Sequence, residues 1–283
     1  MASLDDHPTR ELAAGAKMPV LGLGVWQMAS GAETEQAVSW ALEAGYRHID
    51  TASMYHNEQS VGAALKRSAL PRDEVFVTTK LMPTHTSAAR ELTKSLKRLS
   101  LDYVDLYLIH WPIPLLSTRY WRQLESLQEH GLTREIGVSN YSRDQLETLE
   151  HGGFKTPAVN QVHFSPFHYR RQLLEYCNAH GIVLEAYSPL ERSRGLQDQT
   201  IISLAEQLGR TPAQIMLRWA IQRHAVVTPK SSRQERIRAN AQLFDFELSD
   251  TDMQRLDALD RTGGSPRARG YNRRSDPLNP LRR

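Results

Sequence analysis

The sequence has one cysteine, no long hydrophobic run and no leader-like segment at its start. Cys177 has no second cysteine with which to form an internal disulfide, so we expect a small core residue. No stretch approaches the roughly 18 uncharged apolar residues of a membrane helix. The first residues, MASLDDHPTR, lack the basic and apolar parts of a signal peptide. We therefore predict a cytoplasmic protein with no membrane partner.

The sequence also lacks an excess of positive charge outside the last residues of the chain. The formal net charge is +3, yet residues 261–283 hold seven Arg and one Asp, so the rest is slightly acidic. That part has no basic patch with interleaved aromatics, and we predict no nucleic-acid partner. The tail, 262–283, mixes Gly, Pro and Arg with little periodicity, which indicates a loop.

What the sequence does contain is an alternation of short β-branched runs with longer segments whose apolar residues recur three and four apart. The expected strands are 20–26, 46–50, 75–80, 104–110, 134–140, 158–162, 182–188 and 224–230. The expected helices are 33–45, 58–68, 87–99, 118–130, 142–151, 170–180, 200–222 with a break at 209–212, and 233–241.

Eight such units favour an α/β fold of the closed (β/α)8 type, the TIM barrel, over an open doubly wound sheet, which usually stops at five or six strands. We find no linker, so we predict a single domain over 1–283, with an N-terminal hairpin at 8–19 and the Arg-rich tail outside the barrel. The dinucleotide fingerprint GxGxxG fails, because Gly22 and Gly24 are followed by Gln27 at its third position.

Ionisable residues follow three neighbouring strands of this predicted barrel. Asp50, Lys80 and His110 end the second, third and fourth strands, and Tyr55 lies in the loop after the second. Chemistry in such barrels gathers at the carboxyl ends of the strands. Lys80 would lower the pKa of the phenol of Tyr55, Asp50 would keep the ammonium charged, and a neutral His110 would hold a carbonyl oxygen. The set would deliver a proton to an oxygen.

No side chain supplies a hydride, so a nicotinamide cofactor is the expected electron donor. The best phosphate site is TPKSSRQERIRAN, where Lys230, Ser231, Arg233 and Arg236 lead from the eighth strand into a helix N-terminus. Alone, such a cluster is more often a solvated helix start. Its position after the eighth strand favours phosphate binding, and two or three cations there favour NADPH over NADH.

These residues resemble the aldo-keto reductase family, in particular the prokaryotic members that include 2,5-diketo-gluconate and methylglyoxal-type reductases. GYRHIDTASMYHNE, LDYVDLYLIHWP, IGVSNY and TPKS match the family's motifs in order, from about residue 17 to 260. The resemblance implies a barrel that binds NADPH or NADP without a Rossmann domain, a small carbonyl substrate, and Tyr55 as proton donor within the tetrad Asp50, Tyr55, Lys80 and His110. It also implies a substrate pocket at Trp26, Tyr55, His110 and Trp111. The residues that it implies for the cofactor are Gly24, Val25, Trp26, Ser139, Asn140, Gln161, Tyr187, Ser188, Leu190, Lys230, Ser231, Ser232, Arg233, Arg236 and Asn240.

The chain departs from similar reductases in two places. Ala239 stands where they often have a Glu before the Asn at 240, and Glu191 follows SPL where they have Gly. A carboxylate near a pyrophosphate is unfavourable unless Arg192 or Arg194 compensates. The loop 112–118 is short, which predicts an open pocket and broad specificity.

Other interpretations remain open. Lys80 could form a Schiff base in an aldolase, or the chain could be an NADPH-binding regulatory subunit. His163 and His168 suggest a metal, but no carboxylate accompanies them at a usable spacing, so we predict no metal. We expect a monomer.

Overall fold

The protein folds as a closed parallel barrel in a computed structural model that describes residues 8–82, 87–113 and 116–262. Eight parallel strands pair in chain order. They are β3 (Leu23–Gly24), β4 (His48–Asp50), β5 (Phe76–Leu81), β6 (Val104–Ile109), β7 (Thr133–Ser139), β8 (Val159–His163), β9 (Val183–Tyr187) and β10 (Val226–Val227). A parallel bridge from Leu21 to Val227 joins the first strand to the last. The predicted (β/α)8 barrel is confirmed.

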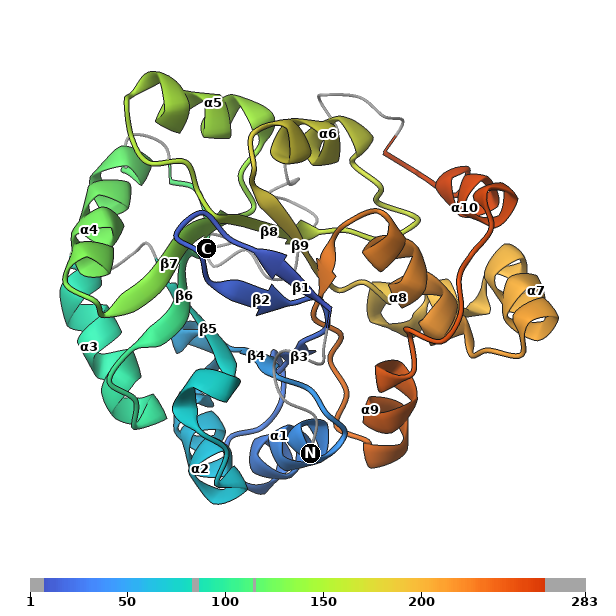
Figure 1. Ribbon diagram of the computed structural model, residues 1–283, viewed down its shortest axis with the longest axis horizontal. Coiled ribbons are helices and arrows are strands. Elements are labelled where there is room, and N and C mark those ends of the chain that lie inside the picture. Colours follow the sequence, from blue (N-terminus) through green and yellow to red (C-terminus); the bar gives the residue numbers. More distant parts are fainter. Residues whose placement is uncertain (1–7, 83–86, 114–115, 263–283) are drawn as a thin grey trace, which may run out of the picture.

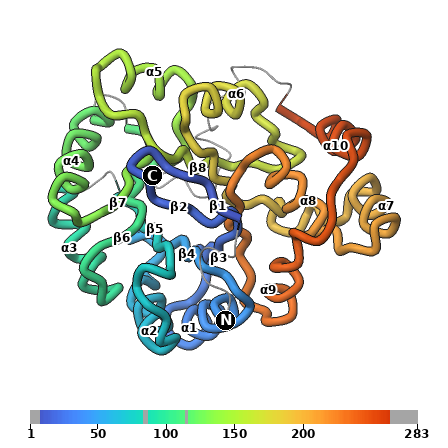
Figure 2. Tube along the Cα trace, in the orientation of Figure 1, coloured from blue at the N-terminus to red at the C-terminus, as the bar shows by residue number. Residues whose placement is uncertain are grey.

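The helices form a ring around the strands (Figures 1 and 2). They are α1 (Ala32–Glu43), α2 (Glu58–Ser68), α3 (Ala88–Leu99), α4 (Ser117–Glu129), α5 (Arg143–His151), α6 (Arg171–Ala179), α7 (Gln199–Leu208), α8 (Pro212–Gln222), α9 (Gln234–Ala241) and α10 (Asp250–Asp257). α7 ends at Gly209, whose φ is +62°, and α8 begins with a capping box on Thr211 and Pro212 in its first turn. This break was predicted.

α10 was missed by the sequence reading. Its start signal was present, because Ser249 and Asp252 form a reciprocal capping box. The helix is short and follows no strand, so the strand-then-helix repeat gave no reason to look for it. Trp219 of α8 donates a hydrogen bond of 2.9 Å to Asp257 at the end of α10, which holds the helix on the outside of the ring.

Alternate residues of the strands face opposite sides of the barrel wall. Val77, Tyr107 and Ile109 belong to the larger hydrophobic cluster between strands and helices. Phe76, Leu106 and Leu108 belong to a second, inner cluster. Because side chains alternate along a strand, the inward set continues from Phe76 through Thr78 to Lys80. The carboxyl end of the same inward row therefore carries polar groups.

A hairpin closes the amino end of the barrel. Its strands, β1 (Thr9–Glu11) and β2 (Lys17–Pro19), lie across the centre of the ring in Figure 1. Leu12 and Met18 are buried in the inner cluster. The backbone N–H groups of Ala14 and Ala16 donate to Oε1 of Glu135 on β7, at 2.8 and 3.3 Å. The predicted hairpin at 8–19 is confirmed, and it leaves the carboxyl end as the open one.

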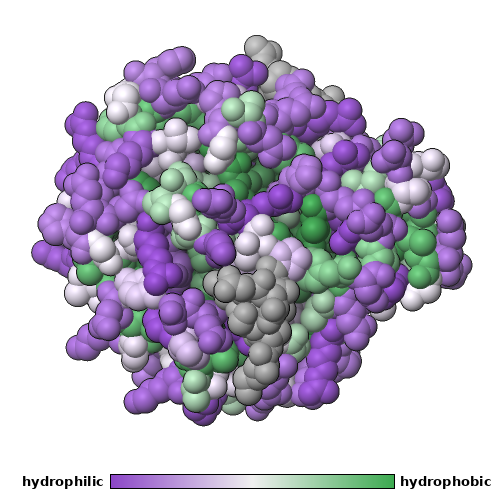
Figure 3. Space-filling view, viewed as in Figure 1, coloured by the Kyte–Doolittle hydropathy of each residue, from purple (hydrophilic) through white to green (hydrophobic). Residues whose placement is uncertain are grey.

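The face seen in Figure 3 is mostly hydrophilic along the outline that the helices form, and hydrophobic side chains show in the gaps between them. No helix within the described ranges is long and apolar enough to cross a membrane. The predicted tail at 262–283 lies outside the described residues, apart from Thr262.

Candidate active site

Three of the four predicted tetrad residues meet at one nitrogen atom. Nζ of Lys80, at the end of β5, donates to Oδ1 of Asp50 at 2.7 Å and to the hydroxyl of Tyr55 at 3.3 Å. A third bond of 2.9 Å goes to the carbonyl oxygen of Thr51. Tyr55 ends a 3₁₀ turn, Ser53–Tyr55, which Ser53 anchors by donating to the carbonyl oxygen of Lys80. The loop after β4 thus folds back onto the end of β5.

The charges of this group are coupled through burial. Burial lowers the pKa of Lys80, but the charge of Asp50 and its hydrogen bond to Nζ act in the opposite direction, and the net pKa lies above its ordinary value. The side chain of Lys80 is 0% exposed and that of Asp50 is 6% exposed, so the ion pair is shielded from water. Lys80 is therefore an ammonium at neutral pH, as expected.

The prediction that the pKa of the Tyr55 phenol is lowered is wrong, because the net shift is upward. Burial raises the pKa of Tyr55 to about 12, and Lys80 lowers it by less than burial raises it. The ammonium lowers the pKa of Tyr55, as expected, but burial raises that pKa by a larger amount. A protonated phenol at neutral pH is still the form that a proton donor needs. Lys80 can then stabilise the negative charge only as the proton leaves.

His110 completes the set from the carboxyl end of β6. Its ring lies edge-on to that of Tyr55, with centroids 5.6 Å apart. Burial and then the charge of Lys80 hold the pKa of His110 well below its ordinary value. The imidazole is therefore neutral, and its Nδ1 has no hydrogen-bond partner among the described residues.

One buried acid below the tetrad was not predicted. Glu185 lies in the middle of β9, where burial, and then the charge of Asp50, raise its pKa to about 8. Neither carboxyl oxygen has a hydrogen-bond partner among the described residues. Gln161 Nε2 bonds Asp50 and Thr228 Oγ1 bonds Ala186, but both donors are close enough to Glu185 to lower its pKa in part. A lone acid in the apolar run IVLEAYS was the available signal.

A cavity opens above the tetrad and encloses about 1130 Å³ of empty space, including the solvent at its mouth. Thirteen predicted site residues line it: Gly24, Trp26, Asp50, Tyr55, His110, Trp111, Ser139, Asn140, Gln161, Tyr187, Ser188, Leu190 and Lys230. The lining that sequence reasoning missed comprises Gln27, Met54, Pro189, Arg192, Ser193, Thr228 and Pro229. None of the described residues of the loop 112–118 lines the cavity.

Polar groups on one wall of this cavity bond one another. Oδ1 of Asn140 accepts a hydrogen bond of 2.8 Å from the hydroxyl of Tyr187. Its Nδ2 donates hydrogen bonds to the carbonyl oxygen of His110 and to Oγ of Ser139. Gln161 Nε2 donates to Asp50 Oδ2 at 2.8 Å. Asn140 has a φ of 65°, a left-handed conformation that Asn tolerates better than most residues. The wall connects the predicted amide-binding residues directly to the tetrad.

The cluster after β10 lies mostly outside the cavity. Lys230 lines it, whereas Ser231, Ser232, Arg233, Arg236 and Asn240 do not. Two predicted residues from elsewhere in the chain, Val25 and Lys80, do not line it either. Lys230, Arg233 and Arg236 are exposed. Arg233 immediately precedes α9, so two guanidinium groups and the helix N-terminus form a surface that suits a phosphate.

Glu191 meets two histidines, which the spacing argument missed. Its Oε1 is 2.8 Å from His163 Nε2 and 3.0 Å from His168 Nδ1, and Ser165 Oγ also donates to it. Burial raises the pKa of Glu191, but these hydrogen bonds outweigh it and hold the pKa well below its ordinary value. Of the two arginines considered as partners for this carboxylate, Arg192 and Arg194, Arg192 lies over the ring of Trp26 at 5.1 Å.

Comparison with known proteins agrees with this geometry. Residues 20–261 match the description "Aldo/keto reductase family". The chain is 46% identical to the methylglyoxal reductase DkgA of Yersinia pestis, with 94% of this chain and 99% of that protein covered. It is 42% identical to the glyoxal reductase of Bacillus subtilis (strain 168), over 91% of this chain and 96% of that one. An aldo/keto reductase structure from Brucella melitensis superposes with a TM-score of 0.85 at 42% identity, covering 90% and 100% of the two chains.

Proposed function

We propose that this chain, which belongs to the aldo/keto reductase family and is therefore an oxidoreductase, reduces small aldehydes and ketones to alcohols with NADPH. The observation that carries the proposal is the contact of buried Lys80 Nζ with Tyr55 and Asp50, two residues that line the cavity. A phenol in contact with an ammonium can donate its proton, because the ammonium stabilises the phenolate that remains.

Tyr55 is the proposed proton donor to the carbonyl oxygen. As the proton leaves, the phenolate forms beside the ammonium of Lys80, where the attraction between opposite charges lowers the energy of the transition state. Asp50 fixes the direction of Nζ and keeps it charged. His110 is neutral and can donate to the same carbonyl oxygen, which orients the substrate.

The cavity wall fits a nicotinamide cofactor. Ser139, Asn140 and Gln161 offer amide and hydroxyl groups for its carboxamide, and the ring of Tyr187 offers a flat face. Bound NADPH supplies the hydride. Lys230, Arg233 and Arg236 are exposed cations near the start of α9, and they suit the additional phosphate that distinguishes NADPH from NADH.

The substrate side of the cavity is apolar. Trp26, Met54 and Trp111 line it beside Tyr55 and His110, and the rings of His110 and Trp111 stack at 5.8 Å. Such walls suit the non-reacting part of a small aldehyde or ketone. Relatives named glyoxal and methylglyoxal reductase make short dicarbonyl compounds the first substrates to try.

The first test replaces Tyr55 with Phe and follows the loss of NADPH absorbance with methylglyoxal. We expect the rate to fall by at least about 100-fold, since general acid catalysis contributes that much or more. NADPH binding, followed by fluorescence, should change little. Tyr103→Phe is the matched control, because Tyr103 lies between Arg72 and Arg134, away from the cavity. A Tyr55→Phe variant as active as the parent would remove the proton-donor role.

The aldolase alternative is less favourable. A Schiff base needs a neutral amine, whereas Lys80 is buried with its pKa raised and donates three hydrogen bonds. Borohydride trapping of a carbonyl compound on Lys80 would support the aldolase. Tight NADPH binding without turnover of any carbonyl compound would instead indicate a regulatory subunit.

A further inference from the structure

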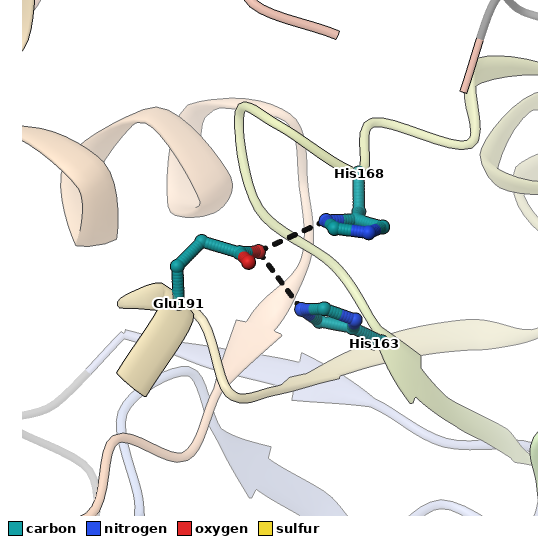
Figure 4. A group of neighbouring side chains, drawn as sticks. All are labelled: His163, His168 and Glu191. Carbon is teal, nitrogen blue, oxygen red and sulfur yellow. Dashed lines mark hydrogen bonds and ion pairs between the residues drawn. The ribbon is translucent and has the colours of Figure 1, made fainter. Parts of the chain in front are cut away.

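His163, His168 and Glu191 form a compact group outside the tetrad (Figure 4). His163 ends β8, His168 follows in the next turn, and Glu191 begins a 3₁₀ turn after β9. One potential ligand atom from each lies within 4.8 Å of the other two. It is the only such group of three or more His, Cys, Asp or Glu residues in the part of the chain that the structure describes.

The three side chains are already held in place. The two imidazole rings stack with centroids 4.0 Å apart, and His163 also stacks on Tyr187 at 5.7 Å. The turn that carries His168 is closed by a 2.9 Å backbone bond from its N–H to the carbonyl oxygen of Ser165. Ser165 Oγ donates to the same carboxylate. Metal sites commonly need such outer contacts to orient their ligands.

Two imidazole nitrogens and one carboxylate oxygen match a known class of zinc ligand sets, which leaves a fourth position for water. The side chains of His163, His168 and Glu191 are 25%, 34% and 17% exposed, so water can reach them. We propose that His163 Nε2, His168 Nδ1 and the Glu191 carboxylate bind one Zn²⁺ or a similar divalent transition-metal ion.

The ligand atoms need only a small adjustment, but the two stacked rings must also move apart so that both lone pairs point at one ion. The N···O distances of 2.8 and 3.0 Å are a few tenths of an ångström shorter than the roughly 3.3 Å between ligands of a tetrahedral ion with bonds near 2.0 Å. Each histidine must direct a lone pair, in place of its N–H, at the ion. That change is a shift of tautomer, with the proton on the other ring nitrogen, so it needs no net loss of a proton.

One neighbouring charge opposes a cation. Arg170 is close enough for its positive charge to act on His163. We therefore expect weaker binding than in a structural zinc site with several thiolates. Without a metal, the same three residues would serve only as a hydrogen-bonded connection between the turn after β8 and the segment after β9.

The test uses the full chain without an affinity tag, stripped with a chelator and then freed of it. Zn²⁺ is titrated in competition with a chromophoric chelator, and Co²⁺ is titrated while its visible absorption bands report coordination. We expect one ion per chain. His168→Gln and Glu191→Gln should each weaken binding by at least about 10-fold. Loss of a residue that only orients a ligand already weakens metal binding by about 10-fold or more, and these two variants remove the ligands themselves.

His180→Gln is the matched control. His180 Nε2 lies 3.7 Å from Glu150 Oε2, a pair with one histidine and one carboxylate but no third ligand. This variant should bind as the parent does. The measurement needs no cofactor or substrate, so its result does not depend on the proposed reductase activity.

If the parent binds no more tightly than His168→Gln and Glu191→Gln, the site is wrong and the cluster is a hydrogen-bonded connection. Should either variant fold poorly by circular dichroism, NMR of the parent's imidazole signals replaces it. Zn²⁺ should then shift the signals of His163 and His168 and leave that of His180 in place. Shifts spread evenly over all histidines would overturn the proposal.

Discussion

The two ends of the barrel interior are built from the same strands but from different chemistry. At the amino end, Phe76, Leu106 and Val159 pack against Leu12 and Met18 of the hairpin. Two to four residues further along, the same inward rows carry Lys80, His110 and Gln161. One end is apolar and closed, and the other is polar and lines a cavity.

The difference shows how the barrel separates stability from chemistry. Side chains recur on the inner face every two residues, about 7 Å apart. A strand can therefore contribute an apolar side chain to the closed end and an ionisable one to the cavity. Substitutions at the closed end should therefore reduce stability without changing kcat, whereas substitutions at the cavity end should reduce activity. The three predictions that follow test this separation.

The largest effect is expected from Lys80→Met at the cavity end. Activity should fall by at least about 100-fold, because the proton donor loses its charge partner. Unfolding free energy should also fall by about 3–5 kcal/mol, since Asp50 is left charged and buried without its ammonium. NADPH turnover and urea unfolding measure the two losses.

The double variant Asp50→Asn with Lys80→Met distinguishes the two causes. It removes both charges, so much of the stability should return while activity stays low. Return of activity together with stability would mean that Lys80 acts only through folding.

Phe76→Ala tests the closed end. Phe76 is buried against the ring of His48, at 5.1 Å in an edge-on contact, and its loss should cost about 3–5 kcal/mol of unfolding free energy. It lies four residues from Lys80, about 13 Å along the strand, so kcat of the folded protein should not change.

Phe244→Ala is the control for this substitution, because Phe244 is 39% exposed. It should change stability by less than about 0.5 kcal/mol. A large fall in kcat for folded Phe76→Ala would contradict the separation of the two ends.

The last prediction concerns Glu185, which lies between the two ends and whose effect is confined to the pH dependence of stability. Its folded-state pKa is raised to about 8, so above the ordinary carboxyl range the folded chain holds a proton that the unfolded chain has lost. Stability of the parent should therefore fall as pH rises from about 4.3 toward 8, by up to about 1.4 kcal/mol per unit. Glu185→Gln should lack this fall.

Urea unfolding of parent and variant at several pH values measures the difference. The stability of Glu185→Gln relative to the parent should grow with pH across that window. A difference that stays constant would show that Glu185 is not protonated in the folded chain. Glu206→Gln, exposed on α7, is the matched control.

Much of the fold was predictable because it is locally repetitive. Each strand carries β-branched residues and each helix a 3.6-residue pattern, so eight repeats indicated the barrel before any contact was known. Asp50, Lys80 and His110 could be assigned to one end because each ends a strand. The single domain, the monomer and the roles of the cofactor residues stay predictions.

What the sequence did not reveal depends on distance in space and on burial. His163 and Glu191 are 28 residues apart, so a rule based on spacing within one segment could not bring them together. The phenol of Tyr55 was expected to be more acidic than usual, but how deeply it is buried decides its pKa. Glu185 had a signal in the sequence, because it is a single acid within an apolar strand. Only its burial in the fold shows that its pKa is raised.

The hairpin has a further consequence for turnover. Because Leu12 and Met18 fill the amino end, the proposed dinucleotide and carbonyl compound would both have to enter from the carboxyl end, where the cavity lies. Under the proposed function, the closed amino end would make the two molecules compete for one entrance, so a high concentration of the carbonyl compound is expected to slow turnover.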